Sequence, residues 1–378
     1  MPGTEVSGPD RFAELRGHPG VVEALSRALD EDRLSPALLF HGPAGVGKLT
    51  AGMELARSLL CLGDAPRPCR QCDACRRLSA SALLHPDVGL LYPQRKRDVE
   101  EKRAKDEAPP TAPDLHAIQE EVRRNPSWKI LAEPARERLG ELFLSPAGGR
   151  RRLLLILASE RLQEESGNAL LKVLEEPPPS ALLLLLCENP RTLLPTLRSR
   201  CQSYRFGTLS RGTIARFLSG APRLPPDQAT LLASLSGGQL GRGLALAEEV
   251  GTYRERRAAL TRVLSEARRQ KTAAAALIAA AGITADQDRI QEDLAILGDL
   301  LRDSMLAGCG CDAALLTEPR GAAESPDGFL FPPLEAAALL GRLERAREDL
   351  RHFVNRQLAL ESLFLDLVNP LTSPLGEE

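Results

Sequence analysis

Glycines and a lysine near the start of the chain have the spacing of a phosphate-binding loop. The set follows the apolar residues 37–41 and consists of Gly42, Gly45, Gly47 and Lys48. Between a strand and a helix, such glycines let backbone N–H groups surround phosphate oxygens, and the helix N-terminus adds its dipole. Lys48 would then contact the terminal phosphates. An ordinary tight turn is the alternative, and the position of all four residues behind an apolar run favours the phosphate loop.

The magnesium position of this loop is altered. A phosphate loop needs Ser or Thr directly after its lysine, so that a hydroxyl group can bind Mg²⁺. Leu49 occupies that position, and Thr50 follows one residue later. On a helix, Thr50 lies about 100° further round. The loop therefore predicts binding of a nucleotide such as ATP or ADP, with Thr50 as the nearest hydroxyl group and without a well-placed magnesium ligand.

Four cysteines with metal-ligand spacing come next. The pattern is C-x7-C-x2-C-x2-C and consists of Cys61, Cys69, Cys72 and Cys75. Thiolates in this number suit a tetrahedral, structural Zn²⁺ with no coordination position left open. An iron–sulfur cluster is one alternative, although a Cys-Pro pair that usually follows such a pattern is missing here. Free thiols are the other alternative. We expect a zinc-binding insert at about residues 61–75.

The position for a catalytic acid is apolar. Residues 153–157 form an unbroken apolar run, which is typical of a strand buried on both faces of a parallel sheet. In a nucleotide-binding sheet, acids at the end of this strand hold a metal and polarise water, but Leu157 and Ala158 stand there. Glu160 is the nearest acid, and a displaced base is its alternative role. Because such groups supply several kcal/mol of transition-state stabilisation, we expect no ATPase activity of the chain's own.

These residues require a sheet and helices to hold them in place. Apolar periodicity predicts strands at residues 37–41, 88–92, 153–157 and 181–186, and helices at residues 115–124, 134–143 and 164–175. After Phe206 this alternation ends, and the remainder reads as helices. A chain of 378 residues is too long for a single hydrophobic core, so two or three domains are expected.

The composition is that of a globular protein and excludes several classes. A net charge of -2 argues against strong, independent binding to nucleic acid. The N-terminus lacks a signal-peptide pattern, and no apolar run approaches the roughly 20 residues of a membrane helix. We therefore expect a cytoplasmic protein without a membrane partner, whose cysteines are reduced or bound to metal. Residues 94–112 form a charged, proline-bearing insertion that reads as a solvated surface segment.

Several stretches resemble the bacterial clamp loader, a branch of the AAA+ ATPases. They run through nearly the whole chain and consist of LLFHGPAGVGK, the four cysteines, GNALLKVLEEPP, LRSRC and NRQLALESLFLDL. The combination of NALLKVLEEPP with SRC at this separation is highly specific. The tau/gamma motor subunits would carry Asp-Glu at positions 157–158, threonine at 49 and Thr-Thr near 187–188. This chain has none of these, and it looks most like the delta prime family of subunits.

The resemblance implies an α/β AAA+ fold with a RecA-like parallel sheet of the P-loop type, a helical lid and an all-α C-terminal collar. It implies an AAA+ module at residues 1–208 that contains the zinc insert, a small lid domain at 209–272, and a collar or oligomerisation domain at 273–378. The family also has a lid arginine that senses nucleotide. The alignment puts Gly241 at that position, with Arg242 one residue on.

The resemblance further implies that Arg200, in Ser199-Arg200-Cys201, is an arginine finger. Its guanidinium would reach the γ-phosphate of ATP in a neighbouring subunit. A surface salt bridge is what an isolated arginine ordinarily makes. The implied partners are the tau/gamma and delta subunits in a heteropentameric ring, the sliding clamp, and primer-template DNA contacted by the complex.

We therefore expect a non-hydrolysing subunit of the DNA polymerase III clamp loader, which helps to load the sliding clamp on primed DNA during replication. An ATP-hydrolysing motor subunit of the same complex is the alternative. A stand-alone DNA- or metal-binding protein is a third reading, and the near-neutral charge and the collar-like helices argue against it.

Overall fold

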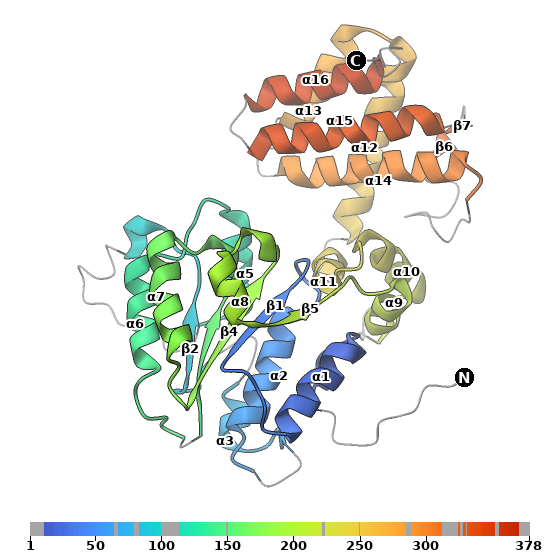
Figure 1. Ribbon diagram of the computed structural model, residues 1–378. Coiled ribbons are helices and arrows are strands. Elements are labelled where there is room, and N and C mark those ends of the chain that lie inside the picture. Colours follow the sequence, from blue (N-terminus) through green and yellow to red (C-terminus); the bar gives the residue numbers. More distant parts are fainter. Residues whose placement is uncertain are drawn as a thin grey trace. The chain divides into compact units, whose positions relative to one another are not determined.

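The chain combines a parallel sheet covered by helices with a largely helical C-terminal region (Figure 1). The computed structural model describes residues 11–63, 67–78, 83–99, 113–148, 150–220, 224–248, 250–284, 289–311, 324–325, 328–329, 331–351 and 355–369. Most of the charged insertion predicted at residues 94–112 therefore lies outside the described residues. The chain divides into two compact units, Met1–Thr213 with Gly238–Gly241, and Ile214–Gly237 with Arg242–Glu378. The predicted division into three domains remains a prediction.

The first unit is built on a five-stranded sheet in the order β2-β3-β4-β1-β5. All neighbouring strands are parallel, and they are β1 (Ala37–His41), β2 (Val88–Leu91), β3 (Arg152–Ile156), β4 (Ala181–Cys187) and β5 (Gln202–Arg205). This order places β1 at an inner position, between β4 and β5. Crossover helices join the strands, as parallel pairing requires. The predicted α/β fold of the P-loop type, with a helical C-terminal region, is confirmed.

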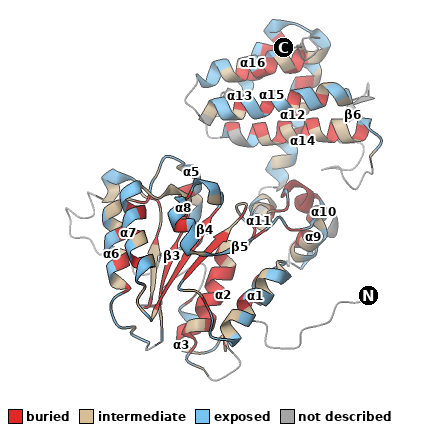
Figure 2. Cartoon of the chain, in the orientation of Figure 1, coloured by how far each residue is buried: buried red, intermediate tan, exposed pale blue. Residues whose placement is uncertain are grey.

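The apolar runs in the strands follow from burial on both faces of the sheet. Alternate residues of β4 belong to two hydrophobic cores, with Leu182, Leu184 and Leu186 in one and Leu183 and Leu185 in the other. All of these leucines are at most 4% exposed. A strand covered by helices on one face only would alternate between apolar and polar residues. Figure 2 shows the inner strands and α2 (Lys48–Leu60) as mostly buried.

The helices of the first unit cover these two faces (Figure 1). One core includes residues of α1 (Pro19–Asp30), α2 and α5 (Leu115–Arg124). The other core includes residues of α6 (Ala132–Glu141), α7 (Glu164–Glu175) and α8 (Pro195–Arg200). A short helix, α3 (Asp73–Arg76), follows the C-terminus of α2. α6 begins two residues earlier than predicted, because a proline such as Pro134 is tolerated in the first turn of a helix.

The second unit has its own core. Its helices are α9 (Arg211–Ser219, which begins in the first unit), α10 (Pro226–Leu235), α11 (Leu240–Glu248, which also begins there), α12 (Val250–Gln270), α13 (Ala273–Thr284), α14 (Ile290–Gly308), α15 (Pro333–Arg351) and α16 (Arg356–Val368). Two short strands, β6 (Glu324–Ser325) and β7 (Gly328–Phe329), pair with each other. Leucines and alanines of α12 to α16 form most of this core. None of the described helices is long and apolar enough to cross a membrane.

Candidate functional site

The phosphate loop connects the carboxyl end of β1 to the start of α2. Gly42, Gly45 and Gly47 all adopt positive φ angles, of 144°, 65° and 108°. A Cβ atom on Gly42 would lie 1.9 Å from the carbonyl oxygen of Phe206, so only glycine fits there. His18, in the turn before α1, forms a hydrogen bond between its Nε2 and the Val46 carbonyl oxygen at 2.8 Å. The predicted loop residues therefore form one structure, and His18, which the motif did not indicate, braces it.

Lys48 begins α2 and folds back over the loop. Its Nζ donates hydrogen bonds to the carbonyl oxygens of Gly42 and Pro43, the latter at 2.6 Å. Burial lowers the pKa of Lys48, and the carboxylates of Glu188 and Glu160 oppose that shift. The ammonium group thus lies in a desolvated site with acids near it. It is placed to exchange these carbonyl partners for phosphate oxygens.

Leu49, at the magnesium position, and Thr50, one residue later, differ in their surroundings. Leu49 is buried in the hydrophobic core formed with α1 and α5, where it is 7% exposed. Thr50 is partly exposed on the same helix. An apolar side chain therefore occupies the position that a hydroxyl ligand needs, and packing holds it there.

Gly241 of α11 lies against the phosphate loop. Its N–H donates to the carbonyl oxygen of Gly45 at 2.8 Å. A Cβ atom on Gly241 would lie 3.0 Å from the Cα atom of Gly45. The position that the alignment gave to a lid arginine therefore makes a backbone contact with the loop. The sensing role itself stays untested.

Glu160 lies near Lys48 although it follows the strand end by several residues. Leu157 is buried, and Ala158 takes a left-handed conformation with φ of 47°, which turns the chain into a short 3-10 helix at Ser159–Arg161. The Glu160 carboxylate accepts the Glu188 N–H at 3.4 Å. Burial raises the pKa of Glu160, as does the nearby charge of Glu188. The positions expected to carry acids are apolar, and the structure brings a different acid to the loop.

The four predicted zinc ligands converge. The Sγ atoms of all four cysteines lie within 4.8 Å of one another, and those of Cys61 and Cys72 are 4.0 Å apart. Tetrahedral ligands at about 2.3 Å from zinc would be about 3.8 Å apart. Backbone N–H groups of Gln71 and Cys72 lower the pKa of the Cys69 thiol to about 6. The donor set and its spacing therefore fit a tetrahedral structural metal ion such as Zn²⁺.

A buried carboxylate joins the cysteine segment to α2. Glu54 is fully buried in α2, and its carboxylate forms ion pairs with Arg57 and Arg70. Arg70 lies between Cys69 and Cys72 and has a positive φ of 58°. Sequence reasoning missed Glu54. The sequence does contain a hint of this buried acid, because both chain neighbours of Glu54 on the helix, Met53 and Leu55, are apolar.

Arg200 is the last residue of α8 and is exposed. Its guanidinium donates to the Glu175 carboxylate at 3.1 Å and to the Thr196 carbonyl oxygen at 3.2 Å. β5 begins at Gln202, which is in register with Leu38 of β1. Because the two strands are parallel, Arg200 lies at the amino edge of the sheet, whereas the phosphate loop follows the carboxyl end of β1. The predicted finger is therefore not part of this chain's own phosphate site.

Comparison with known proteins supports the resemblance. Residues 17–210, just over half of the chain, match the family described as "DNA polymerase III, delta subunit". The chain is 41% identical over 75 residues to DNA polymerase III subunit delta' of Bacillus subtilis, which covers 20% of this chain and 22% of that protein. It is 43% identical over 81 residues to DNA polymerase III subunit gamma/tau of Mycobacterium bovis, which covers 21% of this chain and 14% of that protein. The chain thus spans less than a quarter of the length of these relatives in the matched regions.

Two solved structures are similar to the chain over most of its length. A DNA polymerase III gamma-subunit-related protein of Thermotoga maritima covers 92% of this chain and 98% of its own, with a TM-score of 0.43 and 16% identity. The DNA clamp loader delta protein of Bacillus subtilis covers 92% of this chain and 99% of its own, with a TM-score of 0.33 and 12% identity. From the match over residues 17–210, the chain belongs to the family of DNA polymerase III delta subunits.

Proposed function

We propose that this chain is a delta prime-like subunit of the bacterial DNA polymerase III clamp loader that does not hydrolyse ATP. Its partners are the tau/gamma and delta subunits in a heteropentameric ring, and the assembled loader acts on the sliding clamp and primer-template DNA. Membership of the family supports the proposal that the chain is a clamp-loader subunit. The relatives that match part of the chain include both delta' and gamma/tau subunits. The choice between these two roles depends on the site residues.

The phosphate loop favours the non-hydrolysing role. Leu49 is packed into the core, and the end of β3 continues into the buried Leu157 and into Ala158. Without a hydroxyl ligand and an acid at these positions, magnesium and the attacking water lack their usual partners. ATP or ADP can still contact the glycine-rich backbone and Lys48, with Thr50 nearby. Binding without efficient turnover is the expected behaviour.

The position of Arg200 carries the proposal that it acts in trans as an arginine finger. The side chain is 38% exposed and lies at the opposite edge of the sheet from the phosphate loop of the same chain. Glu175 holds it in an exposed ion pair, which contributes little to stability, so the guanidinium can exchange this partner at small cost. A γ-phosphate in a neighbouring subunit offers the planar guanidinium a bidentate partner.

The cysteine cluster would hold one structural Zn²⁺ through Cys61, Cys69, Cys72 and Cys75. Bound zinc would supply a cross-link between the C-terminus of α2 and the segment that follows it, and no chemistry in ATP turnover. The sulfur atoms already accept N–H groups of their own segment, at 3.3 Å for Cys69 N to Cys61 Sγ. These bonds orient the ligands before the metal binds.

Substitution of Arg200 tests the proposal. In a loader reconstituted with its other subunits, Arg200→Ala should leave assembly intact. It should lower DNA-stimulated ATP turnover at the site it serves by about 10³-fold, as loss of an arginine finger does. Arg198→Ala is the matched control, because Arg198 is exposed on the same helix and donates only a 3.5 Å bond to the Pro190 carbonyl oxygen. An unchanged rate with Arg200→Ala, or an equal loss with Arg198→Ala, would remove the finger assignment.

An ATP-hydrolysing motor subunit is the second candidate function. Glu160 favours it, because the structure brings this acid close enough to oppose the lowering of the Lys48 pKa. Burial raises the pKa of the Glu160 carboxyl group, which makes its carboxylate a stronger base than that of an exposed glutamate. Turnover by the isolated chain would decide for this candidate and against the non-hydrolysing role.

A further inference from the structure

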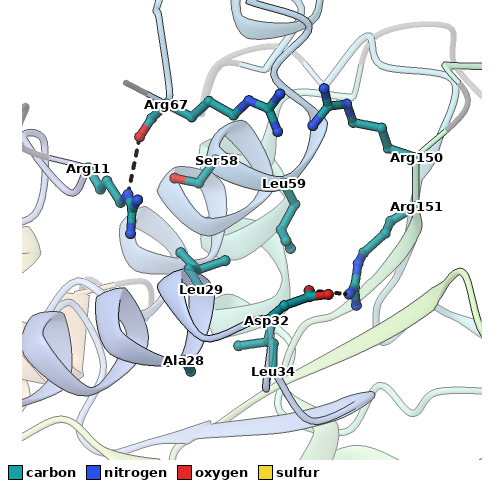
Figure 3. A pocket seen from close by; sticks show the side chains of 10 residues that line it. All are labelled: Arg11, Ala28, Leu29, Asp32, Leu34, Ser58, Leu59, Arg67, Arg150 and Arg151. Atoms are coloured by element: carbon teal, nitrogen blue, oxygen red, sulfur yellow. Dashed lines mark hydrogen bonds and ion pairs between the residues drawn. The ribbon is translucent and has the colours of Figure 1, made fainter. Parts of the chain in front are cut away.

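A cavity of about 370 Å³ opens beside the residues that precede β1 and β3, at the amino edge of the sheet. Figure 3 shows the side chains that line it. Residues just before β1 and β3 line it, together with α1, the end of α2 and the cysteine segment. Four of its ten lining residues are arginines, against a single acid, Asp32. The arginines are Arg11, Arg67, Arg150 and Arg151. The cavity is therefore strongly basic, although the whole chain has a net charge of -2.

Two of these arginines are held by acids. Arg11 pairs with Asp30 at 2.6 Å, and Arg151 pairs with Asp32 at 3.4 Å. Arg11 also donates through its Nε to the Arg67 carbonyl oxygen at 3.3 Å. Arg11 thus links α1 to the cysteine segment and helps to fix one wall of the cavity.

The other two arginines face each other. Figure 3 shows the guanidinium groups of Arg67 and Arg150 pointing toward one another across the cavity. Among the ion pairs between described residues, none involves either side chain. Two like charges in this arrangement repel. A phosphate group between them would remove the repulsion and accept charge-assisted, bidentate hydrogen bonds from both guanidinium forks.

Hydrogen bonds hold part of each wall of the cavity in place. The Nε of Arg67 donates to the Gly63 carbonyl oxygen at 3.2 Å. The turn before Arg150 is anchored by Asp87, whose buried carboxylate accepts the N–H groups of Ala147 at 2.7 Å and Gly148 at 2.8 Å. Binding of an anion would therefore order mainly the two arginine side chains, which limits its entropic cost.

We propose that this cavity binds a backbone phosphate of a nucleic-acid strand. None of the ten described lining side chains is aromatic, and its other walls are mainly aliphatic, so nothing there stacks a base. Recognition is limited to the phosphate and is independent of base sequence. Free phosphate or pyrophosphate has the same chemistry, and the test separates these sources. The inference uses neither Arg200 nor Lys48 and does not rest on the proposed function.

The test measures binding of a fluorescein-labelled oligothymidylate to the full chain by fluorescence anisotropy over a series of salt concentrations. Arg67→Gln/Arg150→Gln should weaken binding about tenfold and lower the salt slope by about 1 to 2, as expected for lost phosphate contacts. The matched control is Arg123→Gln/Arg124→Gln, which changes the net charge equally. These arginines are exposed on α5 and pair with Glu120. The control should bind within about twofold of the parent chain.

A single substitution and two measurements with other anions complete the test. Arg150→Glu leaves the cysteine segment untouched and should weaken binding at least as much as the double variant, with an unchanged thermal unfolding midpoint. Equal losses in both double variants, or no loss in either, would overturn the proposal. Binding of pyrophosphate without binding of the oligonucleotide would assign a free phosphate compound and overturn the nucleic-acid assignment. Displacement of the oligonucleotide by poly-glutamate as readily as by unlabelled oligonucleotide would assign an acidic protein segment instead.

Discussion

The carboxylate of Glu160 is near enough to Lys48 to oppose the lowering of the Lys48 pKa. Burial raises the pKa of the Glu160 carboxyl group above the ordinary value of 4.5. The folded state therefore binds this proton more tightly than the unfolded state does. The stability that protonation contributes is fully present below the ordinary pKa and is lost as the pH rises through the folded pKa. At neutral pH the ionised, partly buried carboxylate thus lowers the free energy of unfolding.

We expect Glu160→Gln to raise the thermal unfolding midpoint by a few degrees at neutral pH, with a smaller gain at about pH 4. The amide oxygen of glutamine can still accept the Glu188 N–H, so that hydrogen bond need not be lost. Circular dichroism melts at the two pH values provide the measurement. Glu164→Gln, at an exposed acid in the first turn of α7, should show no such pH dependence. A loss of stability that is equal at both pH values would contradict the destabilisation that we assign to the ionised Glu160 carboxylate.

The residues of the site that were predictable are those whose roles depend on local spacing. Gly42, Lys48 and the four cysteines form chain-local motifs, and the structure brings each set together. His18 and Glu54 were not predictable in this way. His18 bonds Val46, and Glu54 pairs with Arg70 as well as with the neighbouring Arg57. Val46 and Arg70 are distant from these residues in the chain and come near only through the fold.

The helix α2 connects two of the candidate sites. Lys48 is its first residue, and Cys61 directly follows its last residue. Glu54 lies between them and pairs with Arg70 of the cysteine segment. A metal ion on the cysteines would therefore cross-link the C-terminal end of the helix that begins with Lys48. The stability of this segment should depend on the metal.

We expect about one zinc per chain in the purified protein. Cys72→Ser should reduce that content severely and lower the thermal unfolding midpoint by several degrees, because an incomplete tetrahedral site loses its cross-link. Elemental analysis and a thermal melt measure both effects. Cys309→Ser, at an exposed cysteine outside the cluster, should change neither. A metal-free preparation with an unchanged midpoint would contradict the structural role.

Elements of the sheet were predictable because burial on both faces leaves a simple pattern. The predicted strand at 37–41 coincides with β1, and the helix at 164–175 coincides with α7. β5 was less accessible to such reasoning. Its sequence, Gln202–Arg205, has only Tyr204 buried, since it forms the edge of the sheet. Its assignment requires knowledge of its pairing with β1.

At the scale of the whole molecule, the predicted phosphate loop and the proposed arginine finger lie at opposite ends of the parallel strands β1 and β5. In the isolated chain, Arg200 is therefore not directed at the phosphate loop of the same chain. A neighbouring subunit is needed for Arg200 to act on a nucleotide. The proposed activity belongs to an assembly.

We expect the isolated chain to hydrolyse ATP at a rate indistinguishable from background, with Lys48→Ala causing no further change. The reason is the apolar character of positions 49, 157 and 158. A coupled assay of phosphate release measures this rate. Nucleotide binding, followed separately by equilibrium dialysis, should be weakened by Lys48→Ala if the loop holds phosphate. Hydrolysis that Lys48→Ala abolishes would instead establish a motor subunit.

The leucine run of β4 has a consequence for how the sheet finds its alignment. A shift by one residue moves each side chain of a strand to the opposite face. In β4, residues 182–186 would then mostly exchange leucine for leucine, so the middle of this strand hardly distinguishes correct pairing from a slipped one. Its small end residues, Ala181 and Cys187, and the unlike side chains Ala37 and Phe40 of β1 must provide that information. The ends of β4 therefore carry most of the sequence information that sets the register of this strand in the sheet.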